Sequence, residues 1–198
     1  MNSRIKRLCV FSGSSPGSRS EYSEAATQLG HELVERNIQL VYGGGDVGLM
    51  GVIADTVMSL GGDVIGVIPE FLVKKEIAHN KLTALHTVQS MHERKALMSE
   101  LSDGFIAMPG GIGTLEEMFE VFTWQQLGIQ TKPCALLNTC GYFDYLLKQL
   151  DHAVREKFLK PEHRDMLVVE SEPAQIVKIL ENYKQEYTDK WIDRTWKN

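Results

Sequence analysis

Residues 108–120, MPGGIGTLEEMFE, combine three glycines, a threonine and three glutamates in one short stretch. Glycines let a ligand approach the backbone closely, and the N–H groups at the start of a helix bind phosphate without a lysine. Glu116 and Glu117 follow directly, and a carboxylate beside a bound anion is unfavourable unless it binds sugar hydroxyls or activates water. The stretch therefore favours a ligand with both a phosphate and a sugar, such as a nucleoside monophosphate.

A purely structural interpretation of the same stretch is also open. A tight turn between a strand and a helix can need glycine for its geometry, and Thr114 can act as the N-cap of the helix. Glu117, three residues later, would then complete a capping box. The spacing of these residues does not separate this interpretation from a phosphate site.

Residues 90–98, SMHERKALM, place two cations near the start of another helix. Arg94 and Lys95 lie about one turn into this helix, where positive charge opposes the helix dipole, so a nearby anion would stabilise them. The alternative is a solvated charged face with Glu93 as the internal partner. His92 could act as an acid near neutral pH, although a single histidine at a helix start is more often a surface residue.

A third glycine-rich segment resembles a dinucleotide-binding fingerprint. Gly43, Gly45 and Gly48 fit the pattern GxGxxG, and Asp63 lies 20 residues after Gly43. The acid of that fingerprint must follow the next strand. Asp63 instead begins the apolar run at 63–69, so we expect Asp63 at the opposite edge of the sheet. Nicotinamide chemistry is therefore disfavoured. The sequence also has no Walker A motif, which disfavours hydrolysis of nucleoside triphosphates.

The elements that must position these residues alternate regularly along the chain. Apolar runs predict strands at residues 8–12, 38–42, 63–69, 85–88, 104–108, 133–138 and 166–169. Helical periodicity predicts helices at 21–37, 47–60, 91–101, 114–127, 142–156 and 173–183, with an irregular charged segment at 70–81. Buried strands separated by such helices indicate an α/β fold, a Rossmann-like doubly wound parallel sheet with helices on both faces. The hydroxyl-rich or glycine-rich loops 12–18, 42–51 and 109–117 should then meet in one crevice.

Length and composition set the organisation of the chain. With 198 residues and 43% apolar content, we expect a single nucleotide-binding domain at 1–183 and a C-terminal extension at 184–198. The extension carries Trp191 and Trp196, and we expect it to pack on its own domain or on a partner subunit. The net charge of −5 and the scattered basic residues give no electrostatic footprint for nucleic acid.

The same survey bears on membrane contact, location and metals. No apolar stretch approaches the roughly 20 residues that cross a bilayer, and the N-terminus lacks the apolar core of a signal peptide. Cys9, Cys134 and Cys140 form no CxxC pair, and this pattern favours reduced thiols over disulfides or a zinc site. We therefore expect a cytoplasmic protein without a membrane partner and without a metal site.

Two motifs together resemble the LOG (Lonely Guy) family of cytokinin riboside 5′-monophosphate phosphoribohydrolases. The pattern PGGxGTxxE is fulfilled from Pro109 to Glu117, and an MxxRK element is fulfilled at Met91, Arg94 and Lys95. The resemblance includes the early SGS and YGGGxxGLMG segments and extends to about Tyr183. Sequences of this kind have also been called lysine decarboxylases, but no lysine here lies in a recognisable pyridoxal phosphate context.

The resemblance implies a Rossmann-like homodimer without cofactor. It implies hydrolysis of the N-glycosidic bond of adenosine 5′-monophosphate or an N6-substituted form, which releases the free base and ribose 5-phosphate. Arg94 and Glu117 would be the catalytic pair. The implied substrate-binding residues are Glu76, Lys95, Gly110, Gly111, Ile112, Gly113, Thr114, Leu115, Glu116 and Thr123, with Gly44 and Gly45 as further possible contacts. The helices at 91–101 and 114–127 are plausible dimer-interface elements.

The chemistry of the implied pair fits the implied reaction. Cleavage of the C1′–N9 bond develops positive charge on the ribose, which the Glu117 carboxylate can stabilise while it positions water. Arg94 suits a position beside negative charge, either that of the leaving base or that of the phosphate. The alternative function is a nucleotide sensor that binds without turnover, but a sensor could lose either residue, and both are present.

Overall fold

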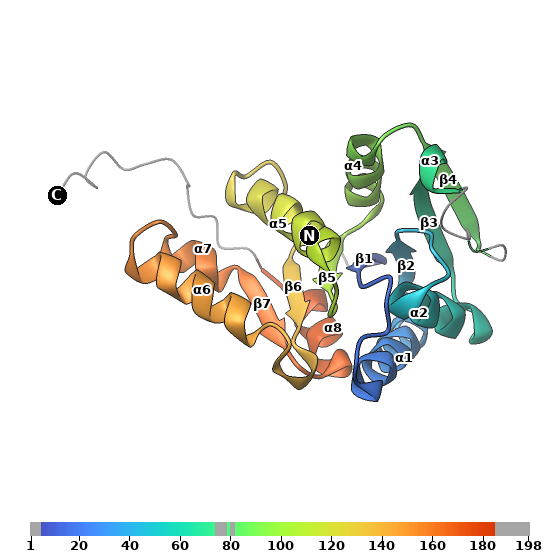
Figure 1. The fold of residues 1–198 in the computed structure, drawn as a ribbon, viewed down its shortest axis with the longest axis horizontal. Helices are drawn as coiled ribbons and strands as arrows, with labels where there is room; N and C mark the ends of the chain where they lie inside the picture. Colours follow the sequence, from blue (N-terminus) through green and yellow to red (C-terminus); the bar gives the residue numbers. More distant parts are fainter. Residues whose placement is uncertain (1–4, 74–78, 80–81, 185–198) are drawn as a thin grey trace.

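The computed structural model describes residues 5–73, 79 and 82–184. Its centre is a seven-stranded sheet in which every neighbouring pair of strands is parallel, in the order β4-β3-β2-β1-β5-β6-β7 (Figure 1). All four residues of β5 and of β6 are buried, as expected for strands covered on both faces. The strands are β1 (Arg7–Phe11), β2 (Gln39–Tyr42), β3 (Val64–Pro69), β4 (Ala84–Val88), β5 (Gly104–Ala107), β6 (Cys134–Leu137) and β7 (Leu167–Glu170).

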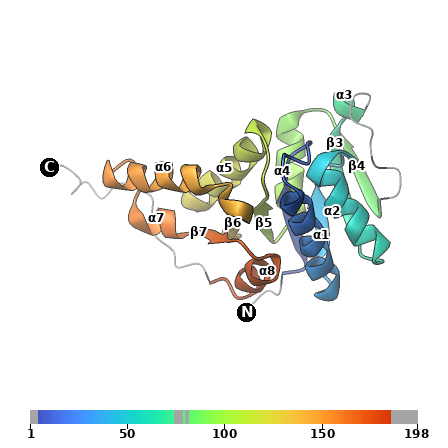
Figure 2. The ribbon, with the colours of Figure 1, turned by 60° about the horizontal axis from the view of Figure 1, so that its bottom comes forward.

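Helices cover the sheet on both faces (Figures 1 and 2). One core cluster joins the sheet to α1 (Ser20–Glu35), α2 (Gly48–Ser59) and α8 (Pro173–Glu181). The other joins it to α4 (Met91–Leu101), α5 (Ile112–Gln126) and, through partly buried leucines, α6 (Asp144–Arg155). The predicted Rossmann-like, doubly wound parallel fold is therefore confirmed.

The strand order places a topological switch between β1 and β5, which pair with each other in register from Leu8↔Gly104 to Phe11↔Ala107. The chain leaves β1 for a helix on one face of the sheet and leaves β5 for a helix on the other face. The connections after these strands therefore lead to helices on opposite faces, and ligands of open α/β sheets bind in the crevice at such a point. The fold thus creates a site beside residues 108–120.

Several element boundaries differ from those expected. Helix α5 begins at Ile112 rather than at Thr114, because Gly111 already has extended backbone angles and serves as the N-cap. The irregular segment contains a short helix, α3 (Glu70–Val73), and a further short helix, α7 (Pro161–Asp165), begins at a proline. A 3₁₀ turn, η1 (Thr139–Gly141), precedes α6.

Some predictions fall outside the described residues. Glu76 is one of them, and so are Trp191 and Trp196 of the C-terminal extension. The domain boundary at residue 183 stays a prediction. Within the described part of the chain, none of the helices is both long and apolar enough to cross a membrane.

Candidate active site

The start of α5 excludes the capping-box interpretation of residues 108–120. Gly111 is the N-cap, and no side chain caps the helix. Thr114 lies inside the first turn and is buried, with 4% of its surface exposed. A side chain at Gly110 would collide with the Thr114 hydroxyl, so Gly110 is required for the threonine to pack beneath the turn. Capping therefore does not explain the threonine.

The two following glycines have no comparable structural reason. A Cβ at Gly111 or Gly113 would meet no atom within 4 Å, and neither residue has a left-handed backbone. Ile112 between them is 82% exposed. The turn would therefore accept alanine at both positions in the free protein. Open space over the first N–H groups of α5 is the arrangement that an anion needs.

The three loops singled out in the sequence converge at this point, as expected. The Gly13 N–H donates to the Pro109 carbonyl at 3.1 Å, and the Leu49 N–H donates to the Gly13 carbonyl at 3.0 Å. A hollow of about 330 Å³ lies between the loops after β1 and β5. Its wall includes Tyr142, whose hydroxyl donates to the Gly110 carbonyl at 2.5 Å. The hollow sits at the topological switch and extends to Gly111.

Helix α4 carries Arg94 and Lys95 into the protein rather than into solvent. Ser90 caps the helix by accepting from the Glu93 N–H at 3.1 Å, and the Glu93 carboxylate accepts from the Gln89 N–H at 2.8 Å. The Glu93 carboxylate is thus occupied at the start of the helix. Arg94 and Lys95 are each only 7% exposed, so the solvated-face alternative is wrong.

Arg94 is held by main-chain oxygens. Its Nε donates to the Val67 carbonyl within β3, and its Nη2 donates to the Gly43 carbonyl after β2, both at 3.1 Å. Its Nη1 lies 3.8 Å from Oε1 of Glu117. The side chains of this pair are 8% and 12% exposed. The structure therefore brings the two predicted catalytic residues together in a largely water-excluded place.

Lys95 has carboxylate partners that the sequence did not reveal. Its Nζ lies 2.5 Å from Oε1 of Glu116 and 3.1 Å from Oε2 of Glu120, both on α5. Burial lowers the pKa of Lys95, but the hydrogen bonds and charges of the two carboxylates outweigh burial and raise it. Glu120 was missed because the helical spacing of 116 and 120 reveals a shared face, not the lysine that meets it.

The remaining predicted site residues lie around this centre. Thr123 is exposed and lies on the turn of α5 after Glu120. Its hydroxyl donates to the Phe119 carbonyl at 2.6 Å. Leu115 is partly buried and packs on the core beneath α5. Gly44 and Gly45 are buried in the loop after β2, and the Gly44 carbonyl accepts from the His79 N–H at 3.3 Å. His92 is exposed.

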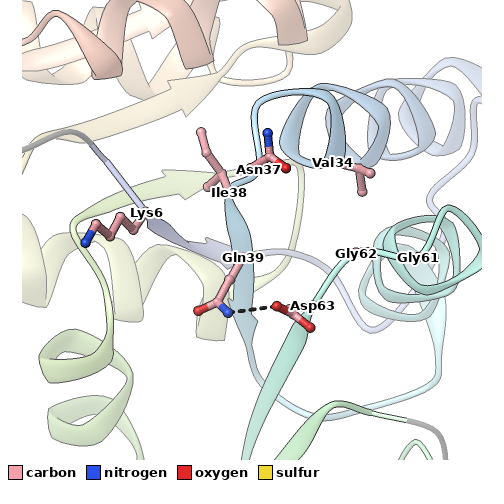
Figure 3. Close-up of a pocket in the computed structure, with 8 residues that line it drawn as sticks. All are labelled: Lys6, Val34, Asn37, Ile38, Gln39, Gly61, Gly62 and Asp63. Atoms are coloured by element: carbon pink, nitrogen blue, oxygen red, sulfur yellow. Dashed lines mark hydrogen bonds between the residues drawn. The ribbon is translucent and has the colours of Figure 1, made fainter.

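Asp63 lies at the other end of the strands, as its position in the sequence predicts. Its carboxylate accepts a 2.9 Å hydrogen bond from Nε2 of Gln39 (Figure 3). Both residues line a separate hollow of about 350 Å³ beside the amino ends of β2 and β3. The distance between this edge and the Gly43–Gly48 loop rules out the dinucleotide fingerprint, whose acid must share the edge of the glycines.

Comparisons with known proteins show which family the chain belongs to. The chain is 48% identical over 196 residues to cytokinin riboside 5′-monophosphate phosphoribohydrolase LOG2 of Arabidopsis thaliana, covering 99% of this chain and 92% of the relative. It is 51% identical over 181 residues to the probable enzyme of the same name, LOGL9, of Oryza sativa subsp. japonica, covering 91% and 80%. The chain belongs to the LOG family. The resemblance inferred from the two sequence motifs is thereby confirmed.

A family model described as "Possible lysine decarboxylase" also matches residues 50–180 of this LOG family member. The lysine among the predicted site residues, Lys95, does not suit that chemistry. Lys95 is paired with two carboxylates that raise its pKa, whereas a lysine that forms a Schiff base must lose its proton readily.

Solved structures resemble the LOG family member in fold. The molybdenum cofactor carrier protein of Chlamydomonas reinhardtii matches with a TM-score of 0.68 and 18% identity, over 90% of this chain and 98% of that one. The molybdenum cofactor binding protein of Rippkaea orientalis matches with a TM-score of 0.68 and 21% identity, over 91% and 98%. At these identities the likeness extends to the fold alone.

The thiols and the candidate metal ligands of this LOG family member were also predicted from the sequence. Cys9 and Cys134 are buried and Cys140 is exposed, and all three are free. Within residues 5–73, 79 and 82–184, no three His, Cys, Asp or Glu side chains are grouped so as to hold a metal ion. The expectation that the reaction needs no metal stays a prediction.

Proposed function

We propose that the chain hydrolyses the N-glycosidic bond of adenosine 5′-monophosphate and of its N6-substituted cytokinin forms. Water adds to C1′ and the base leaves with a proton, so the products are the free base and ribose 5-phosphate. The relatives at about half identity carry the name of this activity. The observation that carries the proposal is a buried Arg94–Glu117 pair beside glycines that the free protein does not need.

In this proposal the 5′-phosphate binds at the start of α5. The N–H groups from Gly111 to Thr114 and the positive end of the helix dipole attract the anion. The open space over Gly111 and Gly113 admits it without moving a side chain. Lys95, Glu116 and Thr123, with Glu76 outside the described residues, would complete the substrate contacts.

Glu117 then lies one turn further along the same helix, where the ribose of a bound nucleotide arrives. Its carboxylate stabilises the positive charge that develops at C1′ and orients the attacking water. Arg94 lies beside this carboxylate, with Nη1 3.8 Å from Oε1. It stabilises the negative charge that develops on the leaving base. Because both side chains are almost fully buried, these charges act with little screening by water.

The test is a panel of nucleoside 5′-monophosphates, each with its unphosphorylated nucleoside, followed by chromatography for free base. We expect release of base from adenosine and N6-substituted adenosine monophosphates only. Equal cleavage of the nucleosides would contradict the phosphate site. Tight binding of the monophosphates without release of base would support the nucleotide sensor instead.

We also propose that the protein is a cytoplasmic homodimer. Ile112, Leu127 and Ile129, at the two ends of α5, are large apolar residues with 82%, 37% and 67% of their surface exposed. An interface along α4 and α5 would cover them, and free thiols suit a reducing compartment. Light scattering should give twice the chain mass of 22.3 kDa, and Ile129→Asp should shift the protein toward the single mass.

A further inference from the structure

The glycine-rich loop after β2 takes no part in the proposed phosphate site, and it contains one glycine in direct contact with Arg94. Gly43 is buried, and its carbonyl accepts from Nη2 of Arg94 at 3.1 Å. The second main-chain acceptor of the guanidinium, Val67, belongs to the neighbouring strand β3. Two fixed oxygens, one in β3 and one in the loop after β2, therefore define the plane and direction of the guanidinium.

The structure also shows why residue 43 is glycine. A Cβ at this position would overlap Nη2 of Arg94, and its next neighbours would be the Arg94 Cζ at 3.3 Å and the Met50 sulfur at 3.4 Å. The backbone of Gly43 is not left-handed, so its conformation does not require glycine. Gly48 in the same loop differs, because its φ is +60° and a side chain would strike the backbone of Ser14 and Ser15.

We propose that Gly43 is a positioning residue for the reaction, and that it acts by leaving the space into which the Arg94 guanidinium fits. The inference rests on the proposed catalytic role of Arg94. Any side chain at residue 43 pushes Nη2 off its carbonyl and turns Nη1 away from Glu117. The atoms that a Cβ at residue 43 would meet first are the end of the flexible Arg94 side chain. This end can move, so the fold tolerates a side chain at residue 43, but the alignment of the guanidinium with Glu117 is lost.

The first experiment compares Gly43→Ala with Gly30→Ala. A Cβ at Gly30 would overlap the Thr56 side chain, where α1 packs on α2 away from the site, so this variant is a matched control for crowding. We expect Gly43→Ala to lower kcat on adenosine 5′-monophosphate about 10²-fold, as displacements of about 1 Å do, while KM stays nearly constant. Gly30→Ala should lower Tm and leave kcat unchanged.

The second experiment is a double-mutant cycle with Arg94→Lys. Lysine lacks Nη2, so a methyl group at residue 43 has nothing to displace, and Gly43→Ala should cause no further loss of kcat or Tm in that background. An equal loss in both backgrounds, or full kcat in Gly43→Ala, would overturn the role of Gly43. Full kcat in Arg94→Lys alone would instead overturn the proposed role of Arg94.

Discussion

Two adjacent glutamates of α5 have different partners. Glu117 faces Arg94 and its side chain is 12% exposed, whereas Glu116 meets Lys95 and its side chain is 50% exposed. Successive residues of a helix point about 100° apart, so a pair of neighbouring carboxylates cannot share one task. Glu117 is therefore the better candidate for chemistry at the sugar, and Glu116, besides its proposed contact with the substrate, pairs with Lys95 between α4 and α5.

The Glu117→Gln variant tests this division. The amide keeps the size of the side chain but loses the charge that would stabilise the ribose, so we expect kcat to fall by about 10²-fold or more. Nucleotide binding, measured by calorimetry, should stay close to that of the unmodified protein. Glu100→Gln, an exposed change on α4, serves as the control. Undiminished turnover by Glu117→Gln would remove Glu117 from the mechanism.

The glycines at the start of α5 allow a second test at single positions. Gly111→Ala and Gly113→Ala place a methyl group in empty space, so Tm should change little. The same methyl would stand where the phosphate is proposed to bind, and KM for the nucleotide should rise at least about tenfold. Gly110→Ala should behave differently and lower Tm, because its Cβ would collide with Thr114 and the Gly13 N–H.

At the scale of elements, α4 and α5 carry the predicted catalytic pair and are joined by Lys95. The Lys95 contacts with Glu116 and Glu120 link residues that are more than 20 positions apart in sequence. The Lys95 side chain is only 8% exposed, whereas those of Glu116 and Glu120 are 50% and 26% exposed, so the lysine is fixed between the two helices by partners that solvent still reaches. The contact therefore helps to fix the distance between Arg94 and Glu117.

This ionic contact predicts how stability responds to alkaline pH. The pKa of Lys95 is raised in the folded protein, because its bonds to Glu116 and Glu120 outweigh burial. The stabilisation is thus complete below the unfolded pKa of about 10.4 and is lost as pH rises through the higher folded pKa. Urea denaturation should show the free energy of unfolding falling as pH rises above about 10.4, the unfolded pKa. Lys95→Met should make this fall shallower.

Lys132 provides the matched control, because burial lowers its pKa. Its ammonium donates to the Ser99 carbonyl at 2.6 Å, but the folded state holds its proton less tightly than the unfolded chain does. Its contribution to stability therefore increases with pH until the unfolded pKa is passed. Lys132→Met should therefore remove an increase in the free energy of unfolding with pH, whereas Lys95→Met removes a fall. Identical pH profiles for the two variants would contradict the assignment of the Lys95 contacts.

The order and type of most elements could be predicted from sequence, because unbroken apolar strands and periodic helices leave a strong pattern. The boundaries were less accessible. Helix α5 begins two residues before Thr114, although glycine at residue 113 has a poor helix propensity. The short helix α7 was missed since five residues are too few for a periodic signal.

The parts of the site that depend on the order of strands and loops along the chain were predictable. The carboxyl ends of parallel strands share one edge, so the convergence of three loops could be inferred before the structure was known. The partners of Arg94 could not, because two carbonyl groups carry no side-chain signature. Glu120 was likewise invisible, since its partner lies on another helix.

At the scale of the whole molecule, the buried sheet also determines the reactivity of the thiols. Burial raises the pKa of Cys9, with a further contribution from the charge of Glu117, and burial raises the pKa of Cys134. Cys140 is exposed. A chromogenic disulfide reagent should therefore modify one thiol per chain rapidly in the native protein and all three in denaturant. Cys140→Ser should abolish the rapid reaction, and a persistent fast phase would indicate opening of the sheet.

The attachment of Arg94 to the backbone has a consequence for engineering. Carbonyl groups persist whatever side chains surround them, so the side chains around the site can be mutated without dislodging the guanidinium, provided that residue 43 stays glycine. Libraries directed at altered base selectivity should accordingly yield many active clones. Base preference can therefore change in this scaffold while the position of Arg94, and with it the rate of the reaction, is preserved.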